Sequence, residues 1–261
     1  MNIDFDKVKR IFAFGCSFTN HCYPTWADVV ASEMPNAFYC NLGIPGFGNH
    51  GIACRVSEAN QRFKFCDTDL ILVMYSTTFR EDRFIGSKWK SFGSVFNNDF
   101  YDRQFIEKYV DPIGMVIRDL AMMNLTNTFI KSLPSQHIIL RSVPIDNESD
   151  NSGFNNTNAF KNIIKTYSEL LNSMPPNLLE LELENIWNKR ITYEFDGKIV
   201  EDSHPTPDIY HSYLKKIGLN LTEKSEVFVR ESMGKLNTCK TIRDLQNAFV
   251  RDFNTLNGQM L

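Results

Sequence analysis

The most constraining stretch of the sequence is residues 69–75, Asp-Leu-Ile-Leu-Val-Met-Tyr. Its apolar residues do not alternate with polar ones, so both faces of an extended segment would be buried. Such a strand is typical of the middle of a parallel sheet, which helices cover on both faces. The stretch therefore predicts an α/β fold with this strand near its centre.

Strands and helical patterns alternate along most of the chain. Further strands are expected at residues 11–14, 38–42 and 137–143, with helices at about 25–34, 52–65 and 112–133. This alternation predicts a three-layer α/β/α sandwich around a central, mostly parallel sheet of about five strands. Asp196-Gly197 indicates a hairpin turn, and residues 84–110 are expected to form an irregular insertion.

The alternation ends near residue 220. We therefore expect one domain over residues 1–222 and a C-terminal helical extension over residues 223–261. Leu245, Phe249 and Phe253 would give this extension an apolar face. That face can pack on the domain or on a partner, so a homo-oligomer formed through these helices is left open.

Composition and charge exclude several classes of protein. The net charge of −3 gives no electrostatic footprint for nucleic acid. No apolar run reaches the roughly 18 residues of a membrane span. The first residues lack the pattern of a signal peptide, so a cytoplasmic location is expected, and a phage-encoded or virion-associated protein fits equally. The six cysteines are scattered, which indicates reduced thiols, and without ligand spacing we expect neither metal nor cofactor.

A small polar residue follows the first predicted strand. Gly15 ends that strand, and Ser17 comes two residues later. At the top of a sheet a serine hydroxyl can be exposed and rigidly held, as a nucleophile requires. The alternative is a plain turn in which Ser17 caps a helix. The nucleophile is favoured by residues 201–205, Glu-Asp-Ser-His-Pro, which put a carboxylate beside a histidine.

Two other strand ends carry groups suited to binding a ligand. Residues 43–51 contain four glycines, and backbone N–H groups of such a loop can approach a ligand closely. An ordinary strand-to-helix connection is the alternative, and the glycine spacing does not fit the dinucleotide fingerprint. Ser76 and Thr78 follow the strand of residues 69–75, at the edge where open α/β sheets place their sites.

Taken in order, these motifs resemble those of the SGNH/GDSL hydrolases over roughly residues 10–220. The resemblance implies a three-layer, flavodoxin-like α/β/α fold and the activity of an esterase, lipase or acyl-carbohydrate deacylase. It makes Ser17 the nucleophile and Gly46 the glycine whose backbone N–H helps to bind the oxyanion. His204 would be the general base, and Asp202 the acid that orients it.

The sequence departs from the family pattern at three points. Cys16 stands where the family usually has an Asp, and because that Asp is mainly structural its loss is tolerable. Thr78 and Ser76 stand where the third block has its Asn and Gly, so the third oxyanion donor can be Thr78, Ser76 or Asn49. One residue separates the acid from the base where two are common. Glu201 has the commoner spacing and is a rival acid, but we favour Asp202.

The predicted function is a serine hydrolase that cleaves an ester through an acyl-enzyme, with an O-acyl or acetyl group on a carbohydrate as one candidate substrate. Arg80 can bind a substrate anion or pair with Glu81 or Asp82, and His50 can contact the substrate or stabilise its loop. The alternatives are acyl transfer by the same triad, a non-catalytic binding module, and a structural virion protein. The expected partner is a small-molecule or carbohydrate ester.

Overall fold

The structure, a computed structural model, describes residues 3–96, 100–145 and 157–249. Its strands are β1 (Arg10–Phe14), β2 (Phe38–Asn41), β3 (Asp69–Tyr75), β4 (Arg80–Ile85), β5 (Lys88–Ser94), β6 (Gln136–Arg141), β7 (Ile191–Phe195) and β8 (Lys198–Asp202). Its helices are η1 (Phe5–Lys7), α1 (Trp26–Ala31), α2 (Asn49–Phe63), α3 (Arg103–Tyr109), α4 (Pro112–Lys131), α5 (Asn158–Thr166), α6 (Ser168–Asn172), α7 (Leu178–Asn188), α8 (Pro207–Lys216), α9 (Glu223–Leu236) and α10 (Ile242–Ala248).

Four strands form the central sheet in the order β2-β1-β3-β6, and all neighbouring pairs are parallel. Every residue of β3 is buried, as its unbroken apolar run predicts. About five strands were expected; among the described residues the remaining strands pair instead as two separate antiparallel hairpins, β4–β5 and β7–β8. The predicted α/β class is confirmed.

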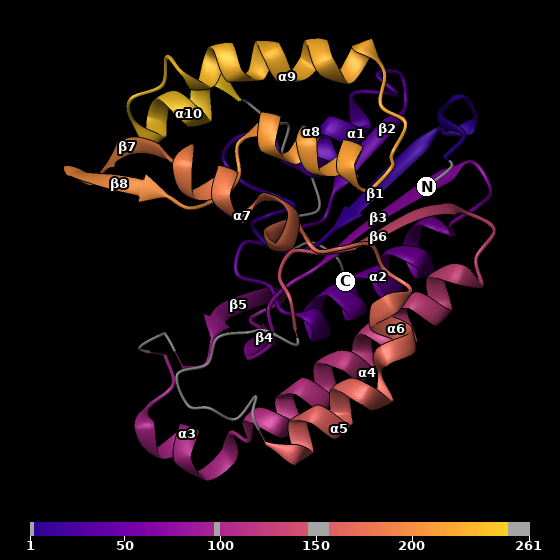
Figure 1. The fold of residues 1–261 in the computed structure, drawn as a ribbon, viewed down its shortest axis with the longest axis vertical. Helices are drawn as coiled ribbons and strands as arrows, with labels where there is room; N and C mark the ends of the chain where they lie inside the picture. Colours follow the sequence, from indigo (N-terminus) through magenta and orange to yellow (C-terminus); the bar gives the residue numbers. More distant parts are fainter. Residues whose placement is uncertain (1–2, 97–99, 146–156, 250–261) are drawn as a thin grey trace.

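Helices cover both faces of this sheet (Figure 1). Phe12 and Phe14 of β1 face a core that includes residues of α2, α4, α5 and α6. Ile11 and Ala13 face the opposite core, with residues of α1, α7, α8 and α9. Successive side chains of a strand point to opposite faces, so one short apolar strand supplies both cores.

Three local expectations have different outcomes. The hairpin at Asp196-Gly197 is confirmed, and both residues have positive φ, 51° and 73°. The irregular insertion at residues 84–110 is wrong in part, because it contains β5, α3 and the end of β4. Helix α2 begins at Asn49 rather than near residue 52, since Asp82 accepts hydrogen bonds from the N–H groups at its start.

The C-terminal helices pack on the rest of the chain. Val229 of α9 joins the core beneath α1 and α8, and Leu236 and Leu245 enclose Tyr23 in a smaller cluster. Phe253 lies outside the described residues. Among the helices of the described ranges, none combines the length and apolar character that crossing a membrane requires.

Candidate active site

Three loops of the predicted site follow neighbouring strands. Ser17 follows β1, Gly46 follows β2, and Thr78 follows β3. These strands are parallel and β1 lies between the other two, so the three loops meet at the carboxyl edge of the sheet. The turn of Ser17 is therefore flanked by the other two loops.

The turn that carries Ser17 is held at its far end, Thr19. The Thr25 hydroxyl donates to the Thr19 carbonyl at 2.7 Å, and the Trp26 indole donates to Thr19 Oγ1 at 3.1 Å. Gly15 begins the turn, and a Cβ at that position would lie 2.1 Å from Thr19 Oγ1. Only glycine allows this close approach, so the sequence around Ser17 specifies a tightly fixed turn.

Within the described part of the chain, the two predicted backbone oxyanion donors have no hydrogen-bond acceptor. Within the described ranges, Ser17 makes no hydrogen bond through its hydroxyl or its N–H, and its side chain is partly exposed. The N–H of Gly46 also donates to no described residue. Gly46 has φ of 81°, which only glycine adopts without strain, and a Cβ there would lie 3.0 Å from Ser91 Oγ.

The carboxylate of Asp202 and the ring of His204 form a hydrogen-bonded pair. Asp202 ends β8, and its Oδ1 accepts from His204 Nδ1 at 2.6 Å and from the His204 backbone N–H at 2.9 Å. Glu201, the rival acid, pairs with Arg190 at 3.2 Å, and its side chain is 57% exposed. The structure thus brings Asp202, and not Glu201, to His204.

This pair lies against the turn of Ser17. The rings of Phe18 and His204 are 5.3 Å apart between centroids. The Tyr23 hydroxyl donates to the His204 carbonyl at 3.0 Å. The candidate base therefore contacts the residue that follows the candidate nucleophile.

A second histidine also contacts the acid, and sequence reasoning missed it. His21 Nε2 lies 2.8 Å from Asp202 Oδ2, on the carboxylate oxygen that His204 does not use. The two imidazole rings stack with centroids 4.0 Å apart and planes 21° apart. The only signal in the sequence was the position of His21, four residues after Ser17.

These three side chains raise the question of a metal site. Ligand atoms of His21, Asp202 and His204 all lie within 4.8 Å of one another, which is close enough to hold a metal ion. The two contacts to the carboxylate, at 2.6 and 2.8 Å, are ordinary lengths for hydrogen bonds. Hydrogen bonding therefore accounts for the geometry of the cluster.

The environment of Asp202 keeps it charged. Burial alone would raise its pKa, but the hydrogen bonds from His204 and His21 outweigh burial and hold the pKa of Asp202 well below its ordinary value. A charged carboxylate fixes a proton on Nδ1 of His204 and leaves Nε2 to accept one. Burial raises the pKa of the neighbouring Tyr193 to about 12, and the charge of Asp202 adds to that rise.

The structure narrows the candidates for the third oxyanion donor. The amide of Asn49 is fully buried and donates to the Ser76 carbonyl at 3.1 Å and to Asp119 at 3.3 Å. Both amide hydrogens are thus engaged, which argues against Asn49 as the donor. Ser76 and Thr78 are also buried, 2% and 1% exposed. Among the described residues the Ser76 hydroxyl has no hydrogen-bond partner.

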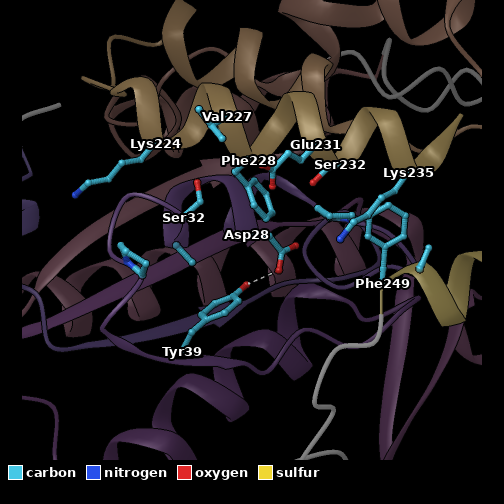
Figure 2. Close-up of a pocket in the computed structure, with 14 residues that line it drawn as sticks. Asp28, Ser32, Tyr39, Lys224, Val227, Phe228, Glu231, Ser232, Lys235 and Phe249 are labelled. Atoms are coloured by element: carbon cyan, nitrogen blue, oxygen red, sulfur yellow. Dashed lines mark hydrogen bonds between the residues drawn. The ribbon is translucent and has the colours of Figure 1, made fainter.

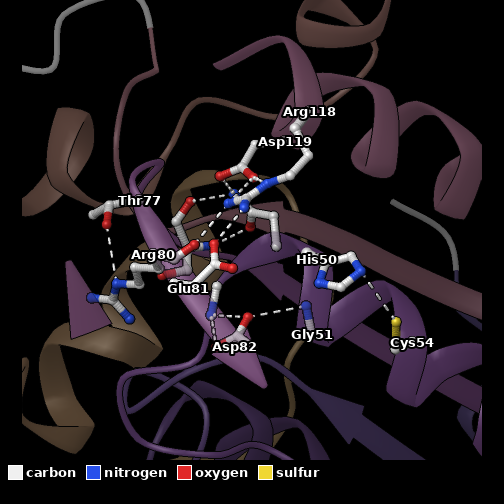
Figure 3. Close-up of polar contacts among 12 residues, drawn as sticks. His50, Gly51, Cys54, Thr77, Arg80, Glu81, Asp82, Arg118 and Asp119 are labelled. Atoms are coloured by element: carbon white, nitrogen blue, oxygen red, sulfur yellow. Dashed lines mark hydrogen bonds and ion pairs between the residues drawn. The ribbon is translucent and has the colours of Figure 1, made fainter. Parts of the chain in front are cut away.

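A network of polar contacts joins β4 to the glycine loop, to α2 and to α4 (Figure 3). Arg80 donates to Thr77 Oγ1 and to the Phe47 carbonyl, both at 3.1 Å. Glu81 instead pairs with Arg118 at 2.7 Å. Of the two alternatives for Arg80, pairing with Glu81 or Asp82 is not seen among the described contacts, and binding of a substrate anion stays a prediction. In the structure Arg80 joins the glycine loop to the segment after β3.

Asp82 holds the start of α2 within this network. Its carboxylate accepts from the backbone N–H groups of Gly48 and Gly51, both at 3.0 Å (Figure 3). Burial raises the pKa of Asp82 to about 6, although these hydrogen bonds and the charge of Arg118 oppose the rise. Burial likewise raises the pKa of Asp119 to about 7.

His50 lies on α2, beside this network. Its Nε2 is 3.7 Å from Cys54 Sγ, and burial lowers the pKa of the imidazole. No contact in the described part of the chain joins His50 to His204. A role of His50 toward a substrate stays a prediction.

A separate groove of about 500 Å³ lies between α1 and α9 (Figure 2). Figure 2 shows Phe228, Glu231 and Lys235 above it and Tyr39 below, with the Tyr39 hydroxyl 3.2 Å from Asp28. None of the predicted catalytic or oxyanion residues lines this groove. It is distinct from the Asp202–His204 pair.

No protein-family model and no curated protein match the chain. Solved structures similar to it include a catalytic mutant of an acetylxylan esterase from Geobacillus stearothermophilus, with 15% identity, a TM-score of 0.44, and coverage of 82% of this chain and 96% of that one. A member of the lipolytic G-D-S-L family from Veillonella parvula has 15% identity, a TM-score of 0.39, and coverage of 85% and 98%. A protein from Bacteroides fragilis described as an acylhydrolase has 16% identity, a TM-score of 0.38, and coverage of 86% and 88%. Because the sequence identities and TM-scores are this low, the assignment of an activity rests on the residues of the site.

Proposed function

We propose that the protein is a serine hydrolase of carboxylic esters, with Ser17 as nucleophile, His204 as general base and Asp202 as the orienting acid. The observation that carries the proposal is the Asp202–His204 pair, 2.6 Å apart and in contact with the turn of Ser17. Nucleophilic catalysis needs such a carboxylate–imidazole pair and a serine hydroxyl within reach of the imidazole. Among the described contacts no hydrogen bond joins Ser17 to His204, and we expect that bond to form when a substrate is bound.

The reaction starts with proton transfer from the Ser17 hydroxyl to Nε2 of His204, as the serine oxygen attacks the ester carbonyl. Asp202 stabilises the resulting imidazolium. His204 then returns the proton to the leaving alcohol, and an acyl group remains on Ser17. A water molecule, activated by the same histidine, releases the acid and regenerates the serine.

The developing negative oxygen is bound by backbone donors. The N–H groups of Ser17 and Gly46 are without partners among the described residues, and each such donor contributes about 3 kcal/mol in the transition state. Thr78 or Ser76 supplies the third donor. A buried hydroxyl can rotate away from the oxyanion, so we expect the third donor to be the weakest.

Within this class we propose an O-acyl group on a carbohydrate as substrate. The hairpin β4–β5 borders the glycine loop, because Ser91 stands against Gly46. The same hairpin carries Trp89, which is partly exposed and packs edge-to-face with Phe84, 5.8 Å between centroids. Aromatic walls beside a few polar groups are typical of sites for small molecules.

A fluorophosphonate probe tests the nucleophile without knowledge of the substrate. We expect the full chain to be labelled, Ser17→Ala to lose the label, and Ser57→Ala, which alters an exposed serine on α2, to keep it. Hydrolysis of 4-nitrophenyl acetate should follow the same pattern. Label retained by Ser17→Ala, or a folded wild-type chain that takes no label, would reject the proposal.

Two further assays define the acyl donor and acceptor. Release of acetate from acetylated xylo-oligosaccharides, with kcat/KM above that for 4-nitrophenyl acetate, is expected if a carbohydrate ester is the substrate. Products formed in the presence of an added alcohol separate hydrolysis from acyl transfer, since only transfer yields a new ester.

A further inference from the structure

The acid of the proposed triad is held by two histidines rather than one. Each carboxylate oxygen of Asp202 has its own imidazole, His204 Nδ1 on Oδ1 at 2.6 Å and His21 Nε2 on Oδ2 at 2.8 Å. The carboxylate side chain is 3% exposed, and those of His21 and His204 are 14% and 24% exposed. The contacts are thus largely shielded from water, where hydrogen bonds to a charged group are strong.

We propose that His21 is a positioning residue for the reaction, which fixes the Asp202 carboxylate from the side opposite His204 and so orients the base. This inference rests on the proposed function for its activity measurements. It gives His21 a role through Asp202, with no contact to substrate.

The protonation states follow from the chemistry of the groups. An ionised carboxylate only accepts hydrogen bonds, so both facing ring nitrogens carry a hydrogen. His21 is then the Nε2–H tautomer and His204 the Nδ1–H tautomer. With His21 donating to Oδ2, the carboxylate cannot rotate without breaking a second bond, and its Oδ1 stays aimed at His204.

Neighbouring groups keep the ring of His21 in place. Tyr23 packs edge-on against it, with centroids 4.5 Å apart, and the stacked ring of His204 lies on one face at 4.0 Å. Asp202 of β8 and Tyr193 of β7 are the other titratable groups of the cluster, and Cys22 is adjacent in the chain. Because the two rings stack, a charge on His21 would oppose the imidazolium that forms on His204.

Two substitutions separate the hydrogen bond from packing. His21→Gln keeps an N–H donor at the position of Nε2, whereas His21→Phe keeps the planar ring and removes the donor. We expect His21→Phe to lower kcat about 10- to 100-fold with KM changed less than threefold, and His21→Gln to restore kcat to within about threefold of wild type. His211→Gln is the matched control, since it removes a histidine that instead contacts Ser225 at 3.3 Å.

Imidazole ¹⁵N and downfield ¹H NMR of the full chain give a readout independent of activity. We expect His21 as the Nε2–H tautomer, and a hydrogen-bonded Nδ1–H signal of His204 that persists in His21→Gln and weakens in His21→Phe. Equal kcat in His21→Phe and wild type, or an unchanged His204 signal, would overturn the inference. So would stoichiometric metal in the purified protein together with loss of activity in EDTA, because the histidines would then be ligands.

The two proposals fail in different ways. If Ser17→Ala keeps the probe label, the proposed function is wrong while the NMR experiment still tests the His21–Asp202 hydrogen bond. If Ser17 is labelled but His21→Phe is fully active, the hydrolase proposal stands and the positioning role of His21 is wrong.

Discussion

Replacement of Asp82 by Asn should change the stability of the protein in a pH-dependent way. The carboxylate is 4% exposed and accepts from Gly48 and Gly51 at the start of α2. Burial raises its pKa from 3.8 to about 6. A group whose pKa is raised in the folded state contributes stability that is present below the unfolded value and is lost as pH rises through the folded value.

The size of the effect follows from the shift. A rise of about two pKa units corresponds to about 3 kcal/mol at 1.36 kcal/mol per unit. This is the largest loss of folding free energy that ionisation of Asp82 can cause between pH 4 and pH 8. Asn does not titrate, so Asp82→Asn removes this loss. The variant also replaces one acceptor oxygen by an amide N–H group, at a cost of about 1–3 kcal/mol that does not depend on pH. The variant should therefore be less stable than wild type at pH 4 and approach or exceed it at pH 8.

Urea unfolding at several pH values between 4 and 8 measures this difference directly. Asp67→Asn is the matched control, because Asp67 is 61% exposed and pairs only across the surface with Lys7 at 3.2 Å. A wild-type-minus-variant difference that is constant with pH would refute the reasoning. A difference that grows as pH rises would show that the two glycine N–H groups stabilise the charged carboxylate more than burial penalises it.

Other substitutions test the candidate site itself. Asp202→Asn should lower kcat by about 10⁴-fold with the fold intact, because it disturbs the tautomer of His204. Glu201→Gln should change kcat by less than about twofold. Steady-state kinetics with 4-nitrophenyl acetate compare the two variants, and a larger loss in Glu201→Gln would make Glu201 the acid. Thr78→Val should lower kcat by roughly 10- to 1,000-fold with little change in KM, and an unchanged kcat would exclude Thr78 as a donor. Gly46→Ala should also lower kcat, since φ is 81° and the new methyl group would lie 3.0 Å from Ser91 Oγ; circular dichroism checks that the variant is folded.

The sheet and the three loops at its edge follow from local patterns. The apolar run of β3 predicts a central parallel strand, and parallel neighbours place their carboxyl ends together. Ser17, Gly46 and Thr78 are therefore gathered by topology alone, without any knowledge of side-chain contacts. Short motifs taken in sequence order can therefore predict which loops lie at the same edge of the sheet.

The contacts behind those loops could not be predicted in the same way. Whether Arg80 pairs with the next residue or with the Phe47 carbonyl, 33 positions away, depends on how the glycine loop packs against β4. The sequence leaves Asn49 open as an oxyanion donor, but α2 begins at that residue and its side chain is buried. Tertiary packing decided both, and neither spacing nor residue type encodes it.

The position of Asp202 shows how the extension bears on the site. Asp202 lies on hairpin β7–β8, outside the central sheet. On one side of the hairpin, His21 contacts Asp202 and Tyr23 contacts His204, so both residues of the pair are joined to the segment that follows Ser17. On the other side of the hairpin, the backbone N–H of Glu194 in β7 donates to the Lys240 carbonyl at 2.8 Å. The hairpin β7–β8 therefore contacts residues on both sides of the predicted boundary at residue 222. Asp202 ends this hairpin and His204 follows it, and Ile191 and Tyr193 of β7 pack with Leu236 and Leu245. The C-terminal helices therefore support the position of the Asp202–His204 pair, although no motif assigned them to it.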